Sequence, residues 1–211
     1  MAIGVKDRKE ILDKLRIAQL NPMQEAAIEV IQGGEDLVLL SPTGTGKTLA
    51  FLLPVIAKLN PELKEVQVLI LVPSRELAIQ IESVTREMGT GYKTNAVYGG
   101  RASAKDRMEL KHRPAILIGT PGRVADHLRR GTFSTADVQT LVLDEFDKSL
   151  EVGFEGEMRE ITENLPRLQH RILTSATQEI RIPEFVGLEN PQKLDFLGEG
   201  GSQLEIKSIV S

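Results

Sequence analysis

The sequence contains no cysteine among its 211 residues and only three histidines. Without thiols the chain cannot form disulfide bonds, bind zinc through thiolates or use a cysteine nucleophile. The histidines, His112, His127 and His170, are scattered and lack the close spacing of metal ligands. These absences argue against a disulfide scaffold and against a metal site built from protein ligands alone.

Long apolar stretches are also absent. No hydrophobic run approaches the roughly 20 residues that a membrane-spanning helix needs, and the first ten residues lack the apolar core of a signal peptide. We therefore expect a protein without a membrane segment. The absence of cysteine fits a reducing compartment, so the sequence favours a cytoplasmic location.

Positive charge is not in excess, because the formal net charge is −4. That balance argues against a surface covered in Lys and Arg for nonspecific binding of polyanions. It leaves open a local nucleic-acid groove, since net charge does not describe how charge is distributed. A length of 211 residues, 41% of them hydrophobic and 27% charged, is typical of one large globular domain.

Apolar segments alternate with amphipathic ones along the chain. The aliphatic runs at 69–72, 116–118 and 141–143 are continuous, which indicates strands buried on both faces. This pattern predicts an α/β fold, with a mostly parallel sheet, helices on both faces and ligands at the carboxyl ends of the strands. The expected strands are 36–40, 66–72, 94–98, 115–119, 139–143, 170–174 and 191–196. The expected helices are 7–17, 22–32, 47–59, 75–88, 103–111, 121–130, 154–164 and 178–187.

The strongest functional signal is the octapeptide Ser-Pro-Thr-Gly-Thr-Gly-Lys-Thr at 41–48. It lies between an expected strand and an expected helix, which is the setting of a phosphate-binding P-loop. Gly44 and Gly46 let backbone N–H groups approach a triphosphate, Lys47 supplies positive charge to its β- and γ-phosphates, and Thr48 offers a hydroxyl to Mg²⁺. The nucleotide-binding residues predicted from this loop are Ser41, Thr43, Gly44, Thr45, Gly46, Lys47 and Thr48.

A second buried strand, 139–143, ends in the adjacent carboxylates Asp144 and Glu145. Near a triphosphate, one carboxylate can hold the Mg²⁺ shell and the other can orient and deprotonate a water aimed at the γ-phosphate. We assign the metal role to Asp144, together with Thr48, because Asp144 directly ends the strand. Glu145 takes the role of the base, so the predicted catalytic residues are Lys47, Asp144 and Glu145. Taken alone, the pair also fits a solvated acidic turn that caps the next helix.

With these residues in place, the chain resembles the N-terminal RecA-like domain of a DEAD-box RNA helicase, from about residue 15 to 200. Asp-Glu-Phe-Asp at 144–147 stands where that family usually has Asp-Glu-Ala-Asp. Further segments resemble family motifs and occur in the family's order. They are Asn-Pro-Met-Gln at 21–24, Pro-Ser-Arg-Glu-Leu-Ala-Ile-Gln at 73–80, Gly-Gly at 99–100, Thr-Pro-Gly-Arg at 120–123 and Ser-Ala-Thr at 175–177.

The resemblance implies a role for each of these motifs. The amide of Gln24 has a donor and an acceptor for adenine N6 and N7, which would select ATP over GTP. The hydroxyls of Ser175 and Thr177 are expected to bond the carboxylate of Asp147 and so couple the ATP site to RNA. The residues implied in RNA-backbone contact, independent of base sequence, are Pro73, Arg75, Gly99, Gly100, Thr120, Gly122 and Arg123.

Two departures from the family pattern stand out. Phe146 replaces the usual alanine and is expected to pack against neighbouring aliphatic side chains. The family also has an adenine-stacking aromatic residue upstream of the Q motif, whereas no aromatic residue precedes Phe51 here. Either an aliphatic residue such as Ile3 or Val5 covers the base, or that element is missing. The basic run of Lys105, Arg107, Lys111 and Arg113 favours a solvated face, with RNA contact as the alternative.

The predicted organisation is one RecA-like domain over 1–197, followed by a linker at 198–211 toward a second RecA-like domain. Nothing in the sequence resembles that second domain, which in the family supplies arginines to the ATP site. Arginine fingers contribute about 10³–10⁵ in rate. We therefore expect a monomer that binds ATP, Mg²⁺ and RNA but is nearly inactive by itself.

Three rival functions remain. A small GTPase-like switch would carry an Asn-Lys-x-Asp string for guanine, and the sequence has none. A P-loop kinase of small substrates would need an arginine-rich lid and no Ser-Ala-Thr segment. A DNA helicase is harder to separate, because a surface that contacts only phosphates does not distinguish RNA from DNA.

Overall fold

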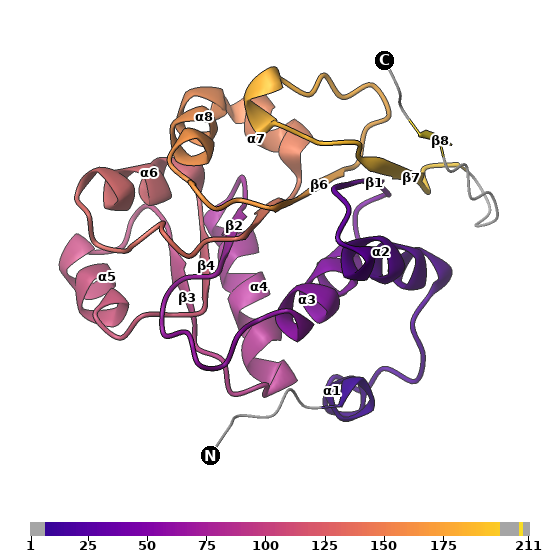
Figure 1. Ribbon diagram of the computed structural model, residues 1–211, viewed down its shortest axis with the longest axis horizontal. Helices are drawn as coiled ribbons and strands as arrows, with labels where there is room; N and C mark the ends of the chain where they lie inside the picture. Colours follow the sequence, from indigo (N-terminus) through magenta and orange to yellow (C-terminus); the bar gives the residue numbers. More distant parts are fainter. Residues whose placement is uncertain (1–6, 199–206, 209–211) are drawn as a thin grey trace.

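The structure is a computed structural model that describes residues 7–198 and 207–208 (Figure 1). Its sheet has the strand order β3-β4-β2-β5-β6-β1-β7-β8. Strands β1 to β7 are parallel, and the short β8 pairs antiparallel with β7. The strands are β1 (Leu37–Leu40), β2 (Val68–Leu71), β3 (Thr94–Val97), β4 (Ile116–Gly119), β5 (Thr140–Leu143), β6 (His170–Ser175), β7 (Gln192–Asp195) and β8 (Lys207–Ser208). The helices are α1 (Arg8–Lys14), α2 (Pro22–Gly33), α3 (Lys47–Ala57), α4 (Arg75–Met88), α5 (Ser103–Leu110), α6 (Pro121–Arg129), α7 (Phe146–Val152), α8 (Glu155–Glu163) and the 3₁₀ helix η1 (Glu184–Val186).

Helices cover both faces of the sheet and form two hydrophobic cores. In β2, Val68 and Ile70 belong to the core beneath α1, α2, α3 and α4, whereas Leu69 and Leu71 belong to the core beneath α6 and α8. Successive strand residues point to opposite faces, so a sheet covered on both sides needs apolar residues at every position. This confirms the predicted α/β fold and explains its continuous aliphatic runs.

Strand order brings three chemically important segments together. Strands β5, β6 and β1 are consecutive neighbours, with Leu40 of β1 in register with Ser175 of β6. The backbone N–H of Ser41 donates to the Ser175 carbonyl at 3.0 Å, and Asp144 directly follows β5. Because parallel strands end at the same edge of a sheet, the segments at 41–48, 144–147 and 175–177 meet there.

The seven expected strands and seven of the eight expected helices are present, most of them with shorter bounds. The helix expected at 178–187 is wrong: only the three residues of η1 form a helical turn there. Pro183 accounts for the difference, because it disfavours helical backbone at the residue before it. Instead, a helix that was not predicted, α7, begins directly after Glu145.

A glycine and a proline mark two further features of the backbone. Gly34 ends α2 with φ of 90°, in the left-handed conformation that favours glycine. Helix α3 continues past Pro54 to Ala57. The linker predicted for 198–211 lies largely outside the described residues, apart from β8. Among the described helices, none combines the length and hydropathy needed to cross a bilayer.

Candidate nucleotide site and nucleic-acid face

The P-loop runs from the end of β1 to the first residue of α3. Gly44 and Gly46 have φ of 83° and 88°, which side chains rarely adopt. At Gly46 an added Cβ would also lie 2.5 Å from Gln24 Nε2, so the Gln24 side chain would have to move to admit it. Within the loop, the hydroxyl oxygens of Ser41 and Thr45 lie 2.7 Å apart. The loop therefore has the left-handed glycines that a phosphate cradle requires.

Lys47 is the first residue of α3 and is buried. Its Nζ donates to the Ser41 carbonyl oxygen at 2.6 Å, which holds the side chain back across the loop. Burial lowers the pKa of Lys47, while the negative charges of Asp144 and Glu145 oppose that shift. The lysine thus lies within the electrostatic field of both predicted catalytic carboxylates.

Asp144 and Glu145 stand at the carboxyl end of β5, and Thr174 joins them. Thr174 Oγ1 donates to Asp144 Oδ1 at 2.5 Å and accepts from the Glu145 N–H at 3.0 Å. Burial raises the pKa of Asp144 to about 6, with repulsion from Glu145 adding to the rise, while the Thr174 hydrogen bond and Lys47 oppose it. Sequence reasoning missed Thr174, although its place directly before the Ser-Ala-Thr segment was a usable signal.

Glu145 has an unusual backbone conformation for a residue with a side chain, with φ of 49° and ψ of 51°. Such left-handed geometry costs about 1–2 kcal/mol. It turns the chain sharply from β5 into α7, and the Glu145 carboxylate pairs with Lys148 Nζ at 2.9 Å. The next residue, Phe146, is fully buried in the core beneath α6 and α8, as predicted.

A cavity of 430 Å³ adjoins these groups. Its lining combines P-loop residues and the two carboxylates with aliphatic side chains. Its lining residues are Leu15, Ile17, Gln24, Thr43, Gly44, Gly46, Lys47, Thr48, Leu49, Leu77, Gln80, Val84, Asp144 and Glu145. The structure therefore brings the predicted catalytic residues, Gln24 and most of the P-loop to one cavity. Ile3 and Val5, the residues considered for covering a base, lie outside the described residues.

Gln24 connects α2 to the P-loop. Its Oε1 accepts from the Asn21 N–H at 2.9 Å, and its Nε2 donates to the Gly46 carbonyl at 3.2 Å. The Asn21 side chain in turn accepts from the Gln24 N–H at 2.8 Å, which completes a capping box at the start of α2. The amide is thus held against the loop at the edge of the cavity.

The expected contacts between Asp147 and the two hydroxyls of the Ser-Ala-Thr segment are not formed. Ser175 Oγ and Thr177 Oγ1 lie 3.2 Å from each other, while Asp147 Oδ2 accepts from the Ala176 N–H at 3.3 Å. The chain turns directly after β6, so Ser175 and Thr177 face one another and a backbone N–H reaches the carboxylate. Asp147 Oδ1 is buried without a hydrogen-bond partner among the described residues.

The residues predicted to contact nucleic acid follow the carboxyl ends of β2, β3 and β4. The guanidinium groups of Arg75 and Arg101 lie 5.5 Å and 5.9 Å from the centre of the Tyr98 ring. Gly100, with φ of 80°, lies beside Arg75, since an added Cβ would be 3.5 Å from its Nη1. Thr120 is the N-cap of α6. The motif segments at 73–80, 99–100 and 120–123 therefore follow three neighbouring strands.

Arg123 is the centre of a buried ion-pair network. Its Nη2 lies 2.7 Å from the fully buried carboxylate of Asp106, and it also donates to the Arg101 carbonyl at 3.0 Å. His127 Nε2 lies 3.0 Å from the same carboxylate. Sequence reasoning missed Asp106, an acidic residue within the basic run, and also Arg101 and Tyr98.

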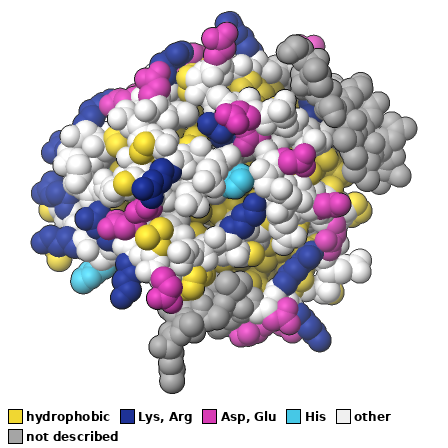
Figure 2. All heavy atoms as spheres, in the orientation of Figure 1, with side chains coloured by type: hydrophobic (Ala, Val, Ile, Leu, Met, Phe, Trp, Pro, Cys, Tyr) yellow, Lys and Arg dark blue, Asp and Glu magenta, His cyan; other side chains and the backbone are white. Residues whose placement is uncertain are grey.

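The basic run forms a mixed surface. Lys105, Arg107 and Lys111 are exposed on and after α5, and Arg113 pairs with Glu65 at 3.4 Å. Figure 2 shows Lys and Arg side chains along the edge over α5 and α6, with Asp and Glu among them. This agrees with the prediction of a solvated face.

Comparisons with known proteins identify the family to which the chain is similar. The DEAD/DEAH box helicase family model matches residues 21–185. The ATP-dependent RNA helicase DeaD of Buchnera aphidicola subsp. Schizaphis graminum is 35% identical over 201 residues, which cover 93% of this chain and 33% of that protein. DeaD of Escherichia coli K12 is 38% identical over 171 residues, which cover 80% of this chain and 27% of that protein.

A solved structure has the same fold. It is that of a hypothetical ATP-dependent RNA helicase from Sulfolobus tokodaii, with a TM-score of 0.77 and 26% identity, covering 90% of this chain and 57% of that one. The chain spans about a third of the length of the first curated relatives. With the family match over most of its length and the motifs meeting at one sheet edge, the chain belongs to the DEAD/DEAH box helicase family.

Proposed function

We propose that this chain is the ATP-binding half of an RNA-dependent ATPase and RNA helicase. It binds ATP with Mg²⁺ and the backbone of RNA, and it hydrolyses ATP and separates strands only together with a C-terminal RecA-like domain. The observation that carries this proposal is the meeting of Lys47, Asp144 and Glu145 at one cavity beside the P-loop. A polyphosphate in that cavity would contact loop N–H groups, the lysine and the carboxylate pair together.

The residues present fit a Mg²⁺ ion that arrives with the nucleotide. Magnesium prefers oxygen ligands and usually takes one or two carboxylates plus substrate phosphates and waters. Asp144 offers a buried carboxylate, and Thr48 offers a hydroxyl at the same cavity. When bound, the ion would neutralise charge on the β- and γ-phosphates.

Glu145 is the proposed base. It has a left-handed backbone, its N–H donates to Thr174 Oγ1, and it lines the same cavity as Asp144. A carboxylate in this place can orient a water toward the γ-phosphate and accept its proton. Lys148 Nζ lies 2.9 Å from this carboxylate.

The aliphatic part of the lining is the proposed adenine end. Leu15 and Ile17 line the same cavity as Gln24, so we propose that aliphatic side chains cover the base in place of an aromatic residue. Contact with Leu and Ile buries the base without the roughly 1–3 kcal/mol of aromatic stacking. We therefore infer that nucleotide affinity is modest. The second Nε2 hydrogen of Gln24 is available to adenine, while its first donates to Gly46.

RNA is proposed to lie across the ends of β2, β3 and β4. Arg75 and Arg101, both stacked on Tyr98, and the N-terminus of α6 would contact phosphate oxygens. Asp147 is proposed to transmit the state of the ATP site, since its carboxylate accepts a hydrogen bond from Ala176 of the Ser-Ala-Thr segment.

We also propose that the protein is a monomer and that it is located in the cytoplasm.

The nucleotide proposal is tested by titrating a fluorescent ATP analogue, with Mg²⁺, into the wild-type chain and the Lys47→Ala variant. We expect at least a tenfold loss of affinity in the variant, since a charge beside the phosphates is removed. Lys105→Ala, an exposed lysine on α5, should bind as the wild type does. Unchanged binding by Lys47→Ala, with circular dichroism showing a folded protein, would exclude the proposed site. A preference for the GTP analogue would favour the rival switch.

The helicase part of the proposal needs a second measurement. The chain joined to a C-terminal RecA-like domain of a relative should show ATP hydrolysis that RNA stimulates and DNA of the same sequence does not. The isolated chain should show neither stimulated hydrolysis nor unwinding. Unwinding by the isolated 211 residues would contradict the proposal.

A further inference from the structure

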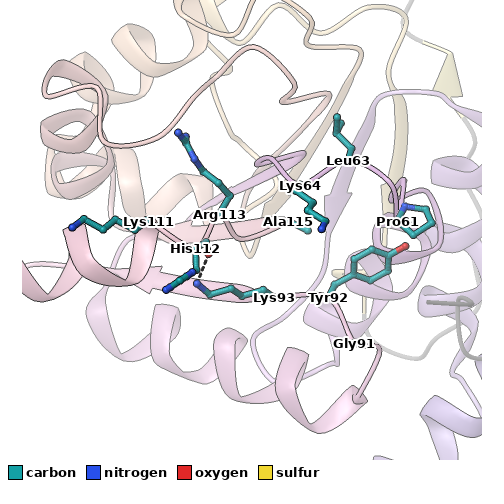
Figure 3. Close-up of a pocket in the computed structure, with 10 residues that line it drawn as sticks. All are labelled: Pro61, Leu63, Lys64, Gly91, Tyr92, Lys93, Lys111, His112, Arg113 and Ala115. Carbon is teal, nitrogen blue, oxygen red and sulfur yellow. Dashed lines mark hydrogen bonds between the residues drawn. The ribbon is translucent and has the colours of Figure 1, made fainter. Parts of the chain in front are cut away.

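A second cavity lies at the opposite end of the sheet from the nucleotide site. Its volume is 440 Å³, and Figure 3 shows its lining residues. They are Pro61, Leu63, Lys64, Gly91, Tyr92, Lys93, Lys111, His112, Arg113 and Ala115. Lys93 directly precedes β3 and Ala115 directly precedes β4, so the cavity is at the amino ends of these strands. Four strand residues, about 13 Å, separate it from the edge that carries the nucleotide site.

The cavity combines an apolar floor with a basic rim. Pro61, Leu63, Tyr92 and Ala115 supply apolar surface, and the Tyr92 hydroxyl is turned away to the Leu59 carbonyl at 3.1 Å. None of the ten lining residues is acidic, although the chain as a whole carries a net charge of −4. The cavity lining is therefore positively charged, whereas the chain as a whole has a net negative charge.

The basic side chains differ in how fully they are engaged. Lys93 Nζ donates to the carbonyl oxygens of Glu109 and His112 at the end of α5, which uses two of its three hydrogens. Arg113 pairs with Glu65, and the side chains of Arg113 and Lys111 both extend outward in Figure 3. Within the described part of the chain, the side chains of Lys64 and Lys111 have no hydrogen bond or ion pair. The available charge therefore comes from Lys64, Lys111 and the third hydrogen of Lys93.

The neighbouring acidic residues decide what kind of anion fits. Glu62 and Glu65 lie two and one positions from Lys64 in the chain, so an extended polyanion bound to Lys64 would also meet negative charge. A compact ligand with a few carboxylates avoids that repulsion. The apolar floor adds a place for one aliphatic or aromatic side chain, which a phosphodiester backbone does not supply.

The edge of the sheet next to the cavity is closed to strand addition. The N–H of Ala96 in the edge strand β3 donates to Glu82 Oε1 at 3.2 Å, and its carbonyl accepts from Arg101 Nη1 at 3.0 Å. A peptide therefore cannot pair along β3 at this position, and it has to bind through its side chains.

From these observations we propose that this cavity is a docking site for an acidic peptide segment of a partner protein. The segment places an aliphatic or aromatic side chain on the floor formed by Leu63, Tyr92 and Ala115, and its carboxylates pair with Lys64, Lys93 and Lys111. The site is independent of ATP and RNA binding, because it lies at the other end of the strands. It gives the domain a surface for recruitment that leaves the nucleotide and nucleic-acid faces free.

The probe for this proposal is a fluorescein-labelled ten-residue peptide, Ser-Asp-Glu-Asp-Phe-Glu-Asp-Leu-Ser-Gly. We expect saturable binding below about 1 mM, which weakens as salt is raised from 50 to 300 mM because exposed charges are screened. In an amide NMR spectrum of the wild-type chain, the peptide should shift the signals of Tyr92, Lys93 and Ala115. A peptide with Asn and Gln in place of the acidic residues, and one with Ala in place of Phe, should each bind more weakly.

Charge-reversal variants locate the binding. Lys64→Glu is expected to weaken binding about fivefold, and the double variant with Lys111→Glu more strongly, since each change replaces an attraction with a repulsion. Lys105→Glu makes the same charge change on α5 outside the cavity and should stay within about twofold of the wild type. All three positions are exposed, so the variants are expected to fold.

Three outcomes would overturn the proposal. The first is no saturable binding of the acidic peptide. The second is equal weakening by Lys64→Glu and Lys105→Glu, which would indicate nonspecific attraction. The third is a single-stranded oligouridylate that shifts the Tyr92, Lys93 and Ala115 signals while the peptide does not, which would assign the cavity to nucleic acid. Because none of these measurements uses ATP, failure here is distinguishable from failure of the proposed helicase function.

Discussion

Replacing Asp144 with asparagine is expected to stabilise the fold at neutral pH while removing a predicted Mg²⁺ ligand. Burial, aided by the charge of Glu145, raises the pKa of the Asp144 carboxyl to about 6. Asparagine has nearly the same shape and keeps an oxygen that accepts the hydrogen bond from Thr174. It has no charge to desolvate, so the variant avoids a penalty that the wild type carries.

The size of the effect follows from the two pKa values. The folded-state pKa of about 6 exceeds the ordinary value of 3.8, so between these values the folded protein keeps a proton that the unfolded chain has lost. The free energy of unfolding of the wild type therefore falls as pH rises through this window, and the loss is complete above pH 6. At 1.36 kcal/mol per pH unit, the whole window corresponds to about 3 kcal/mol.

Urea unfolding of both proteins across pH tests this reasoning. The stability difference in favour of Asp144→Asn should grow from about 1 kcal/mol at pH 4.5 to about 3 kcal/mol at pH 8. The control is Asp126→Asn, because a hydrogen bond from Arg130 lowers the pKa of Asp126, and this variant should gain nothing as pH rises. A difference for Asp144→Asn that does not change with pH, or a variant less stable than the wild type at pH 8, would refute the argument.

Two further variants test the loop and the ion-pair network. Alanine is strained at both Gly44 and Gly46, by about 1–2 kcal/mol, but only at Gly46 does the new Cβ meet Gln24 Nε2, at 2.5 Å. Gly46→Ala should therefore lower the thermal midpoint in scanning fluorimetry more than Gly44→Ala, and equal losses would show that the Gln24 contact is unimportant. Asp106→Asn leaves the cation of Arg123 without its buried partner, so we expect a loss of about 3–5 kcal/mol in urea unfolding and weaker RNA binding. A loss below 1 kcal/mol would show that the network does not hold this arginine.

Much of the site could be predicted because its signals are local in sequence. The P-loop depends on glycines and a lysine at fixed spacing between a strand and a helix, and Asp144 and Glu145 are marked by the buried strand before them. Continuous aliphatic runs such as 141–143 predicted a sheet covered on both faces, since every strand position has to be apolar in that case. The structure confirms the α/β sheet, and it places P-loop residues and both carboxylates at one cavity.

The features that sequence reasoning missed depend on long-range contacts. Thr174 became part of the site only because β6 lies beside β5, and Asp106 reaches Arg123 across 17 positions of the chain. The hydrogen bonds expected from Ser175 and Thr177 to Asp147 do not form, because the direction of the chain after β6 decides which group faces that carboxylate. Their neighbours are set by strand order and by turns, which short motifs do not encode.

By itself, the sequence determined the α/β class, the P-loop, the carboxylate pair and the family resemblance, because each is a local pattern of residue types that tolerates few alternative structures. Tertiary structure decided which of these groups share a cavity, which hydrogen bonds tune Asp144, and that the amino ends of β3 and β4 enclose a basic cavity. Those properties arise from residues far apart in the chain that packing brings within a few ångströms, and the burial that shifts a pKa exists only after the chain has folded.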